Sequence, residues 1–356
     1  MEILTVISPG LKTEKLRRMI SDVISGADCE PQIVTGSETW PADYKGRKLL
    51  FAVELDEIGS DFEFLTYLKA LSQSKPNFEG AHAALLINAS TELFSKTFAK
   101  LAIFNLNQLG LAFIGKPLVE ALPEEINLKT WQKHTAGTRP EILERLCKDL
   151  GYRLSQARID KPSRLKLMVL HNSDIRTSNT LMLTHKVIQR LEGYLGDRLK
   201  VEEIRLEDGT IRDCRGCTFH TCMSFAENKA CFYSGDKFTQ IFASIEETDA
   251  ILWVCPNYND TISAVLMATI NRMSGIYRTV RLDQKRIYGI VVSANSGGDS
   301  VAMQLIDGLC LNKGFMLPPY FALIEIANEP LSVLRNRGID ARIEAFAGHI
   351  GLQLQE

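Results

Sequence analysis

The sequence predicts an α/β protein with two consecutive domains, each built on a parallel sheet with helices on both faces. Short apolar runs alternate with helical patterns along the chain, which is typical of a doubly wound sheet. The order of these patterns also repeats: residues 3–7 match 167–171, residues 49–54 match 251–256, and residues 83–90 match 290–296. Because 356 residues are enough to bury two cores, we interpret the repeat as an internal duplication.

Composition narrows the class of function. Hydrophobic residues make up 45% of the chain and charged residues 24%, and the net charge is −2. Without an excess of basic charge, a nucleic-acid partner is not expected, and small-molecule chemistry becomes the default. The chain begins at Met1 without a cationic leader, and no apolar run has the length of a membrane span. We therefore expect a cytoplasmic protein with no membrane partner.

The first predicted domain covers residues 1–160. Its strands are expected at residues 3–7, 49–53, 83–87 and 110–114, with helices between them. The turn after the first strand contains Pro9, Gly10 and Leu11, where a phosphate site would need Ser or Asn. We therefore expect a degenerate domain without a ligand loop, which serves as a structural or dimer-forming partner. The polar residues 160–164 mark its boundary.

The second predicted domain covers residues 164–356 and opens with the most informative loop of the chain. Residues 167–170 predict a buried strand, and the apolar periodicity after Ser178 predicts a helix. The loop between them offers hydroxyls, an amide and one cation. These side chains are Ser173, Arg176, Thr177, Ser178, Asn179 and Thr180. Since a helix N-terminus leaves N–H groups unpaired and partly positive, such a loop suits a singly esterified phosphate.

The spacing of this loop argues against two familiar nucleotide sites. It lacks the Gly-x-Gly-x-x-Gly of dinucleotide sites and the Gly-Lys-Ser/Thr of nucleoside triphosphatases. The alternative to a phosphate site is an ordinary helix cap in a Ser/Thr-rich turn.

Two further polar loops follow buried strands of the second domain. After the strand at 250–255 come Pro256, Asn257, Tyr258 and Asn259, and after the strand at 290–293 come Asn295, Ser296, Gly297 and Gly298. Tyr258 supplies a large ring for stacking with a polar tip. Backbone amides near Asn257 or Gly297 can stabilise negative charge on a ligand.

Four cysteines lie between the second and third strands of this domain. They are Cys214, Cys217, Cys222 and Cys231, with intervals of two, four and eight residues. Four thiolates can hold a [4Fe-4S] cluster or tetrahedral zinc, and two can form a redox-active disulfide. They can equally be ordinary reduced cysteines. His220, inside this segment, can be a ligand, a proton donor or neither.

Taken in order, these features resemble the flavodoxin-like NADPH-dependent FMN reductases, and among them the iron-sulfur flavoproteins. The shared pattern is a Ser/Asn/Thr phosphate loop, a Cys-x-Gly-Cys segment, Pro-x-Tyr after the next core strand, and then a Gly-rich loop. The resemblance covers about residues 164–325. It implies two tandem flavodoxin-like domains with parallel sheets of strand order 2-1-3-4-5, the first degenerate, and FMN at the carboxyl ends of the strands.

By this resemblance, the side chains of Ser173, Arg176, Thr177, Ser178, Asn179 and Thr180 would hold the FMN phosphate. Residues 256–259 would lie along the isoalloxazine ring, and residues 295–298 would close its other edge. The four cysteines would hold a [4Fe-4S] cluster. No protein acid or base is required, because the hydride chemistry belongs to the cofactor. The sequence departs from the pattern at Met267, where the family often has Lys, and at Asn271, where it has Asp. The phosphate loop is one residue longer than usual, and the interval before the third cysteine is four residues instead of two.

The expected function is that of an FMN-dependent oxidoreductase. It would take electrons from NAD(P)H or an electron carrier and pass them to a quinone, a nitro or azo compound, or a protein acceptor. One alternative is a flavin or iron-sulfur protein for electron transfer or redox sensing without small-molecule turnover. Another is a duplicated scaffold without flavin. A homo-oligomer is expected, because flavodoxin-like reductases bury the flavin edge against a second subunit.

Overall fold

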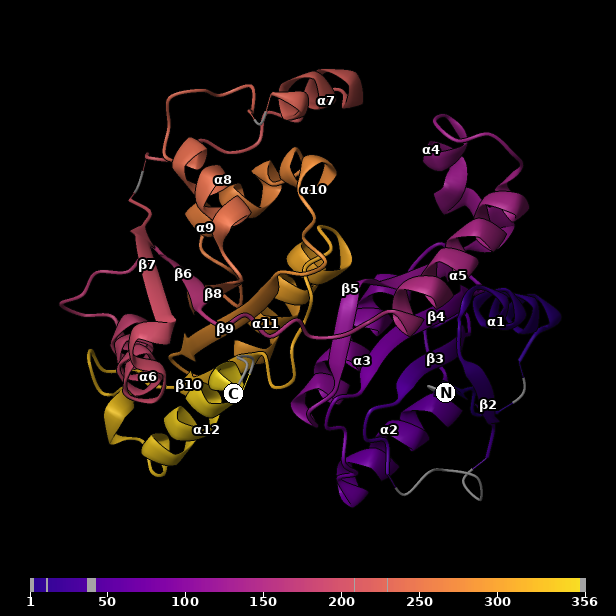
Figure 1. The fold of residues 1–356 in the computed structure, drawn as a ribbon, viewed down its shortest axis with the longest axis horizontal. Coiled ribbons are helices and arrows are strands. Elements are labelled where there is room, and N and C mark those ends of the chain that lie inside the picture. Colours follow the sequence, from indigo (N-terminus) through magenta and orange to yellow (C-terminus); the bar gives the residue numbers. More distant parts are fainter. Residues whose placement is uncertain (1–2, 11, 37–42, 208, 229, 353–356) are drawn as a thin grey trace. The chain divides into compact units, whose positions relative to one another are not determined.

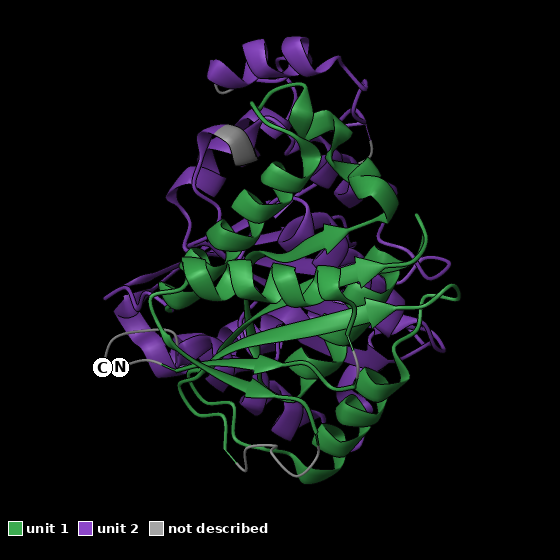
Figure 2. Ribbon diagram, turned by 90° about the vertical axis from the view of Figure 1, so that its right-hand side faces the viewer, with its two compact units in different colours: residues 1–158 green, residues 159–356 purple. Residues whose placement is uncertain are grey.

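The computed structural model describes residues 3–10, 12–36, 43–207, 209–228 and 230–352 (Figure 1). The chain divides into two compact units, Met1–Arg158 and Ile159–Glu356 (Figure 2). Within the described residues, no helix combines the length and the apolar character that crossing a membrane requires.

The first unit alternates strands and helices. Its strands are β1 (Ile3–Ile7), β2 (Glu30–Val34), β3 (Lys48–Leu55), β4 (His82–Ala89) and β5 (Ala112–Ala121). Its helices are α1 (Glu14–Gly26), α2 (Phe62–Ser74), α3 (Ser95–Gln108), η2 (Pro123–Leu128), α4 (Lys129–Gln132) and α5 (Arg139–Ser155).

The second unit follows the same plan. Its strands are β6 (Leu165–His171), β7 (Leu199–Arg205), β8 (Ala250–Pro256), β9 (Arg286–Ser293) and β10 (Ala322–Ile326). Its helices are α6 (Asn179–Leu195), η3 (Gly196–Arg198), α7 (Phe219–Glu227), α8 (Phe238–Glu247), α9 (Ala264–Arg272), α10 (Ile276–Thr279), α11 (Gly298–Leu305), η4 (Ile306–Leu311), η5 (Val333–Arg335) and α12 (Ile339–Gly351).

Both sheets are parallel and have the same strand order. The first runs β2-β1-β3-β4-β5, and the second, read from its other edge, runs β7-β6-β8-β9-β10. In each unit this is the order 2-1-3-4-5, so the predicted fold class is confirmed. Neighbouring strands in each sheet are parallel, so the chain connects them through crossovers. The carboxyl ends of all strands in one sheet therefore meet at one edge.

The central strands of the first unit are buried on both faces, as parallel strands between helical layers must be. Every residue of β4 is buried. On one face, the rings of Phe51, Phe64 and Tyr67 pack with centroids 5.9 to 6.4 Å apart. On the other face, α1 and α5 cross so closely that a Cβ on Gly26 would overlap the carbonyl oxygen of Lys148.

The second unit has a similar core. Trp253, at the centre of β8, has no exposed surface. Helices α6 and α12 pack together over one face of the sheet, and the ring of Phe346 from α12 meets Tyr288 of β9 edge-on at 6.1 Å. This packing fixes the position of α6, whose N-terminus follows the predicted phosphate loop.

A buried ion pair stabilises the carboxyl edge of the first unit. Lys12 Nζ lies 2.6 Å from Asp61 Oδ2, and the two side chains are 5% and 2% exposed. Asp61 also caps α2 by accepting the N–H of Phe64 at 3.0 Å, and it accepts the N–H of Glu54 at 2.9 Å. Removal of one partner from a buried pair leaves the other charge without compensation.

We expect Asp61→Ala to lower the free energy of unfolding by about 3 to 5 kcal/mol, because Lys12 would be left buried and α2 uncapped. Urea denaturation of the full chain measures this change. The matched control is Glu79→Ala, which breaks the exposed Lys45–Glu79 pair and should change the stability far less, because solvent screens that pair. Equal effects of the two substitutions would contradict the assignment.

Candidate functional site

Three polar loops of the second unit meet at the carboxyl edge of its sheet. They follow β6, β8 and β9, and these strands are neighbours, with β8 in the middle. The predicted site residues in 173–180, 256–259 and 295–298 lie at the end of β8, in these loops or in the first helical turn that follows them. The edge also contains the point where strand order reverses, between β6 and β8. Open α/β sheets bind ligands at such a point.

The loop after β6 is a tight turn that leads into α6. The backbone N–H groups of Thr177 and Ser178 both donate to the carbonyl oxygen of Asp174, at 3.2 and 2.9 Å. The Ser178 hydroxyl caps α6 by accepting the N–H of Leu181 at 3.1 Å. The predicted N-cap is thus formed. Ser173 is 4% exposed, and its hydroxyl is buried without a hydrogen-bond partner.

The predicted cation of this loop is paired with an acid from the same loop. Arg176 Nη2 lies 2.6 Å from Asp174 Oδ2, and the Arg176 side chain is 82% exposed. Hydrogen bonds from Arg176 hold the pKa of Asp174 well below its usual range, so this carboxyl group stays ionised. The net charge of the pair near the start of α6 is therefore close to zero.

Asn179 connects the loop to a distant segment. Its Nδ2 donates to the carbonyl oxygens of Ala327 and Glu329, at 3.2 and 2.8 Å, and its Oδ1 accepts the N–H of Val333 at 2.9 Å. Both ends of the amide are used within the protein. Asn179 thereby fastens the first turn of α6 to the chain that follows β10. Thr180, the next residue, is 2% exposed.

Asn257 joins the other two loops. Its Nδ2 lies within hydrogen-bond distance of Ser293 Oγ, the Ser296 carbonyl oxygen and Asp260 Oδ1, at 3.0, 3.0 and 3.1 Å. Its Oδ1 is buried without a partner. Asn257 therefore holds the loop after β8 against the loop after β9.

Asp260 and Gly297 make a close contact where the loop after β8 meets the loop after β9. Asn259 and Asp260 have positive φ angles of 53° and 59°, and Gly297 has a φ of 85°. A Cβ on Gly297 would overlap Asp260 Oδ1, so only glycine fits at this position. Gln304 of α11 also holds the loop after β8 in place. Its amide donates to the Asp260 carbonyl at 2.8 Å and accepts the N–H of Ile262 at 3.1 Å.

Tyr258 is a large aromatic side chain that this edge leaves accessible. It is 52% exposed, and its backbone bridges to Thr261 in a tight turn. Cys255, in the strand that precedes this loop, has no exposed surface, and burial raises the pKa of its thiol, which stays protonated.

The described residues show no grouped ligands at the predicted metal site. Among the described residues, no three His, Cys, Asp or Glu side chains are grouped so that they could hold a metal ion, and Cys214, Cys217, Cys222 and Cys231 are all described. The extra residues between the second and third cysteines start helix α7, which is capped by the Thr218 hydroxyl and includes Cys222. Figure 1 shows α7 beyond α8 and α10, on the side away from the sheet. The four thiolates therefore do not converge in this structure, and a cluster or zinc bound to them stays a prediction.

A buried arginine organises the segment that contains the last of these cysteines. Arg272, at the end of α9, donates to the Tyr233 carbonyl at 3.0 Å and forms an ion pair with Asp236. Its guanidinium also lies 4.4 Å from the centre of the Phe238 ring. Arg272 thus anchors the chain segment that follows Cys231.

The corresponding edge of the first unit is filled by its own side chains. Thr13 caps α1, and its N–H and hydroxyl donate to Glu54 Oε2 at 3.2 and 2.9 Å. Asn88 Nδ2 donates to Glu54 Oε1 at 2.6 Å. A carboxylate therefore lies at the N-terminus of α1, where negative charge is stabilised. In the turn before Thr13, Gly10 has a φ of 77°, and Leu11 lies outside the described residues.

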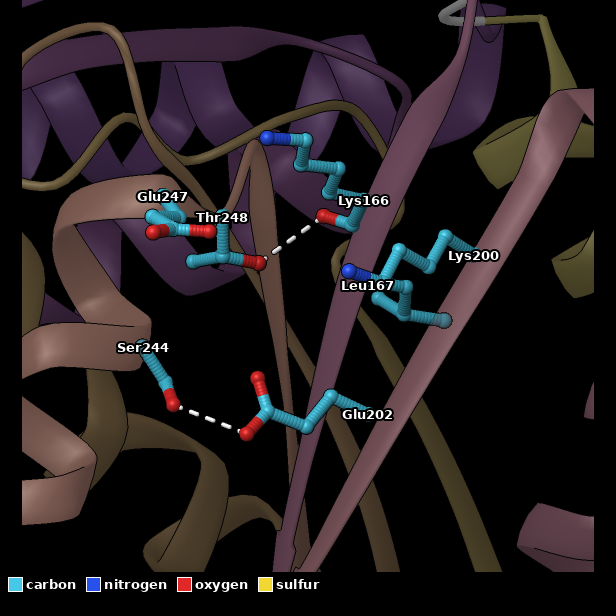
Figure 3. Close-up of a pocket in the computed structure, with 7 residues that line it drawn as sticks. All are labelled: Lys166, Leu167, Lys200, Glu202, Ser244, Glu247 and Thr248. Atoms are coloured by element: carbon cyan, nitrogen blue, oxygen red, sulfur yellow. Dashed lines mark hydrogen bonds between the residues drawn. The ribbon is translucent and has the colours of Figure 1, made fainter.

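The opposite end of the second sheet contains a cavity that is too small for a cofactor. It lies between the first residues of β6 and β7 and the end of α8, and its volume of about 20 Å³ suits a single water molecule (Figure 3). Hydrogen bonds from Thr248 to the Lys166 carbonyl and from Ser244 to Glu202 close it, at 2.8 and 2.9 Å. A larger open hollow of about 390 Å³ borders the β6 loop. Its lining residues are Ile175, Met182, His185, Lys186, Gln189 and Leu334.

Several solved structures are similar to part of the chain. RosB in complex with 8-demethyl-8-formylriboflavin-5'-phosphate is 14% identical, with 53% of this chain and 78% of that chain covered and a TM-score of 0.42. An FMN-dependent NADH-azoreductase from Bacillus anthracis in complex with FMN is 13% identical, with coverages of 53% and 100% and a TM-score of 0.39. The Trp repressor binding protein from Bacillus subtilis is 17% identical, with coverages of 51% and 99% and a TM-score of 0.36. No curated protein matches the chain.

The sequence comparison with protein families gives a more specific result. The model of the family described as NADPH-dependent FMN reductase matches residues 165–329. This segment runs from the first residue of β6 to beyond the end of β10, so it contains the whole sheet and all three loops of the site. The second unit is therefore similar to the NADPH-dependent FMN reductase family through residues 165–329.

Proposed function

We propose that the second unit binds FMN at the carboxyl edge of its sheet. With it, the chain transfers electrons from NAD(P)H, or from an electron carrier, to a quinone, a nitro or azo compound, or a protein acceptor. The loop after β6 holds the phosphate, and the loops after β8 and β9 hold the ring system. The cofactor supplies the electron-transfer chemistry when it is bound.

The observation that carries this proposal is the set of unsatisfied polar atoms at this edge. Asn172 Oδ1, Ser173 Oγ and Asn257 Oδ1 are buried without hydrogen-bond partners in the structure. Buried polar atoms are nearly always hydrogen-bonded in folded proteins. Atoms of this kind on two of the three loops suit a polar ligand that spans the edge. The family match supports FMN as that ligand.

The chain's own residues bind FMN and orient it. Ser178 keeps the first turn of α6 in place, so its N–H groups can face a phosphate. Asn257 and Gln304 keep the two ring loops together, which reduces the cost of ordering them on binding. Tyr258, half exposed, offers a stacking surface at the open side of the edge. This open side is where we place the electron acceptor.

The first test is the absorption spectrum of the protein, purified without oxygen and then supplied with FMN. We expect bound flavin that is released by heat, and oxidation of NAD(P)H when a quinone or azo dye is added. Iron and sulfide analysis of the same sample tests the four-cysteine hypothesis, and we expect no stoichiometric iron. A protein that stays colourless with FMN would refute the proposal, whereas bound flavin without NAD(P)H oxidation would favour an electron carrier.

The Arg176–Asp174 pair gives a test of the phosphate position. We expect Asp174→Asn to strengthen FMN binding by roughly twofold to fivefold, because it removes a negative charge and releases Arg176 from an exposed ion pair. The gain should shrink at high salt and should be absent for riboflavin, which has no phosphate. The matched control is Asp283→Asn, which releases the similarly exposed Arg281 far along the sequence. An equal gain for riboflavin would show that the phosphate lies elsewhere.

The contact between Asp260 and Gly297 gives a test of the ring loops. Gly297→Ala should weaken FMN binding by about tenfold or more, because the new methyl group displaces Asp260 and strains a positive-φ position. Asp260→Gly removes the obstructing carboxylate, so the double variant should recover part of the loss. We expect a coupling of about 1 kcal/mol in a double-mutant cycle of FMN dissociation constants. Purely additive losses would contradict the contact.

A further inference from the structure

His171, the last residue of β6, is attached to the loop that follows it. Its side chain is 3% exposed. The backbone N–H of Ser173 donates to His171 Nδ1 at 3.3 Å. A ring nitrogen accepts a hydrogen bond only when it carries no proton, so this contact requires a free lone pair on Nδ1. The imidazole is therefore neutral, with its proton on Nε2.

The other ring nitrogen faces a carboxylate that is shared with a second histidine. His171 Nε2 lies 3.0 Å from Glu203 Oε1, although the two groups are not aligned as a hydrogen bond. Glu203 Oε2 lies 3.1 Å from His185 Nε2. Glu203 comes from β7 and His185 from α6, so the carboxylate connects three elements around the loop. Its position favours a proton on Nε2 of His171 and thus the acceptor at Nδ1.

We propose that His171 is a positioning residue for the phosphate loop, and that the loop is held by the neutral ring and released when Nδ1 takes up a proton. Protonation would turn the acceptor into a second donor directed at the Ser173 N–H, and two donors cannot bond to each other. The inference rests on the proposed FMN site, because the loop that His171 holds is the one assigned to the phosphate. It adds a pH-dependent step to that function.

The surroundings of His171 set the direction of this dependence. Burial lowers the pKa of His171 below its ordinary value of 6.5, while Glu203 of β7 acts in the opposite direction. His185 of α6 and Arg205 of β7 add to the lowering. On the other side of β6, strand β8 has no charged residue, and its buried Cys255 stays a neutral thiol.

The direction in which stability changes with pH follows from the lowered pKa of His171. The folded protein binds a proton at His171 less readily than the unfolded chain does, so stability rises with pH in this range. The contribution of the neutral ring is complete above pH 6.5 and is lost as the pH falls below that value. The loop should therefore be ordered at neutral pH and released in acid.

Two substitutions at His171 distinguish the effect of the hydrogen-bond acceptor at Nδ1 from the effect of protonating the ring. Asn at position 171 places an amide oxygen near the position of Nδ1, so His171→Asn retains the acceptor and cannot titrate in this range. Gln reaches farther, toward the position of Nε2, so His171→Gln approaches Glu203 and leaves the Ser173 N–H without an acceptor. The two side chains are otherwise chemically alike, which makes each the control for the other.

The experiment measures the ratio of FMN to riboflavin affinity between about pH 8 and about pH 5. The phosphate of FMN titrates near pH 6 in every variant, so only differences between variants report on the protein. For the wild type, we expect the ratio to fall by roughly threefold to tenfold more than for His171→Asn, as expected for the loss of one hydrogen bond. His171→Gln should have a low ratio at all pH values.

A second readout does not depend on FMN. Hydrogen exchange of the Ser173 amide should accelerate in acid, relative to neighbouring amides, for the wild type and not for His171→Asn. Glu203→Gln supplies a milder variant that leaves His171 in place, and it should move the wild-type transition to lower pH, because the carboxylate favours the protonated ring.

The outcomes separate the two proposals. A pH dependence of the affinity ratio or of Ser173 exchange that is unchanged in His171→Asn would overturn the role of His171, whatever binds at the edge. Wild-type binding by His171→Gln would overturn it as well. If no variant binds FMN while Ser173 exchange still follows His171, the proposed cofactor is wrong and the positioning role stands.

Discussion

The parallel pairing of β6 with β8, and of β8 with β9, is the constraint on which the rest of the second unit depends. Parallel strands place all their carboxyl ends at one edge, and the reversal of strand order beside β6 opens that edge between two loops. Residues as far apart in sequence as Ser173, Asn257 and Gly297 therefore reach the same face. The backbone hydrogen bonds of the sheet bring them there, and helices α6 and α12 hold the sheet from one side.

Side-chain amides, more than glycine-rich backbone, hold the loops of this edge in place. Asn179 and Asn257 each bond to backbone groups of a segment distant in sequence, and Gln304 does the same from α11. Such bonds fix loop geometry before any ligand arrives, which lowers the entropy lost on binding. They also change how some predicted residues are understood. Asn179 was expected to contact phosphate, and in the structure its amide bonds to the chain after β10.

The two units show how one fold can present different edges. Both have the strand order 2-1-3-4-5 and a helix capped by a hydroxyl after the first strand. In the first unit, Glu54 faces the cap residue Thr13 and takes its hydrogen bonds. In the second, the Ser173 hydroxyl and the Asn257 oxygen have no partner in the structure. The sheet and its helices do not dictate this difference, which depends on a few side chains at the strand ends.

The sequence by itself determined the α/β class, the alternation of strands and helices, and the three loops of the candidate site, because buried parallel strands read as unbroken apolar runs and polar loops interrupt them. Strand β2 was not predicted, since four of its five residues are exposed and no apolar run marks it. Only the tertiary structure decided which side chains meet. The contacts of Asp174, Asp260 and His171 with their partners, and the separation of the four cysteines, depend on loop conformations and on chain segments brought together by folding. Apolar periodicity does not encode such contacts, because those of Asp174 with Arg176 and of His171 with Ser173 depend on the conformation of one loop, and the others join residues that are distant along the chain.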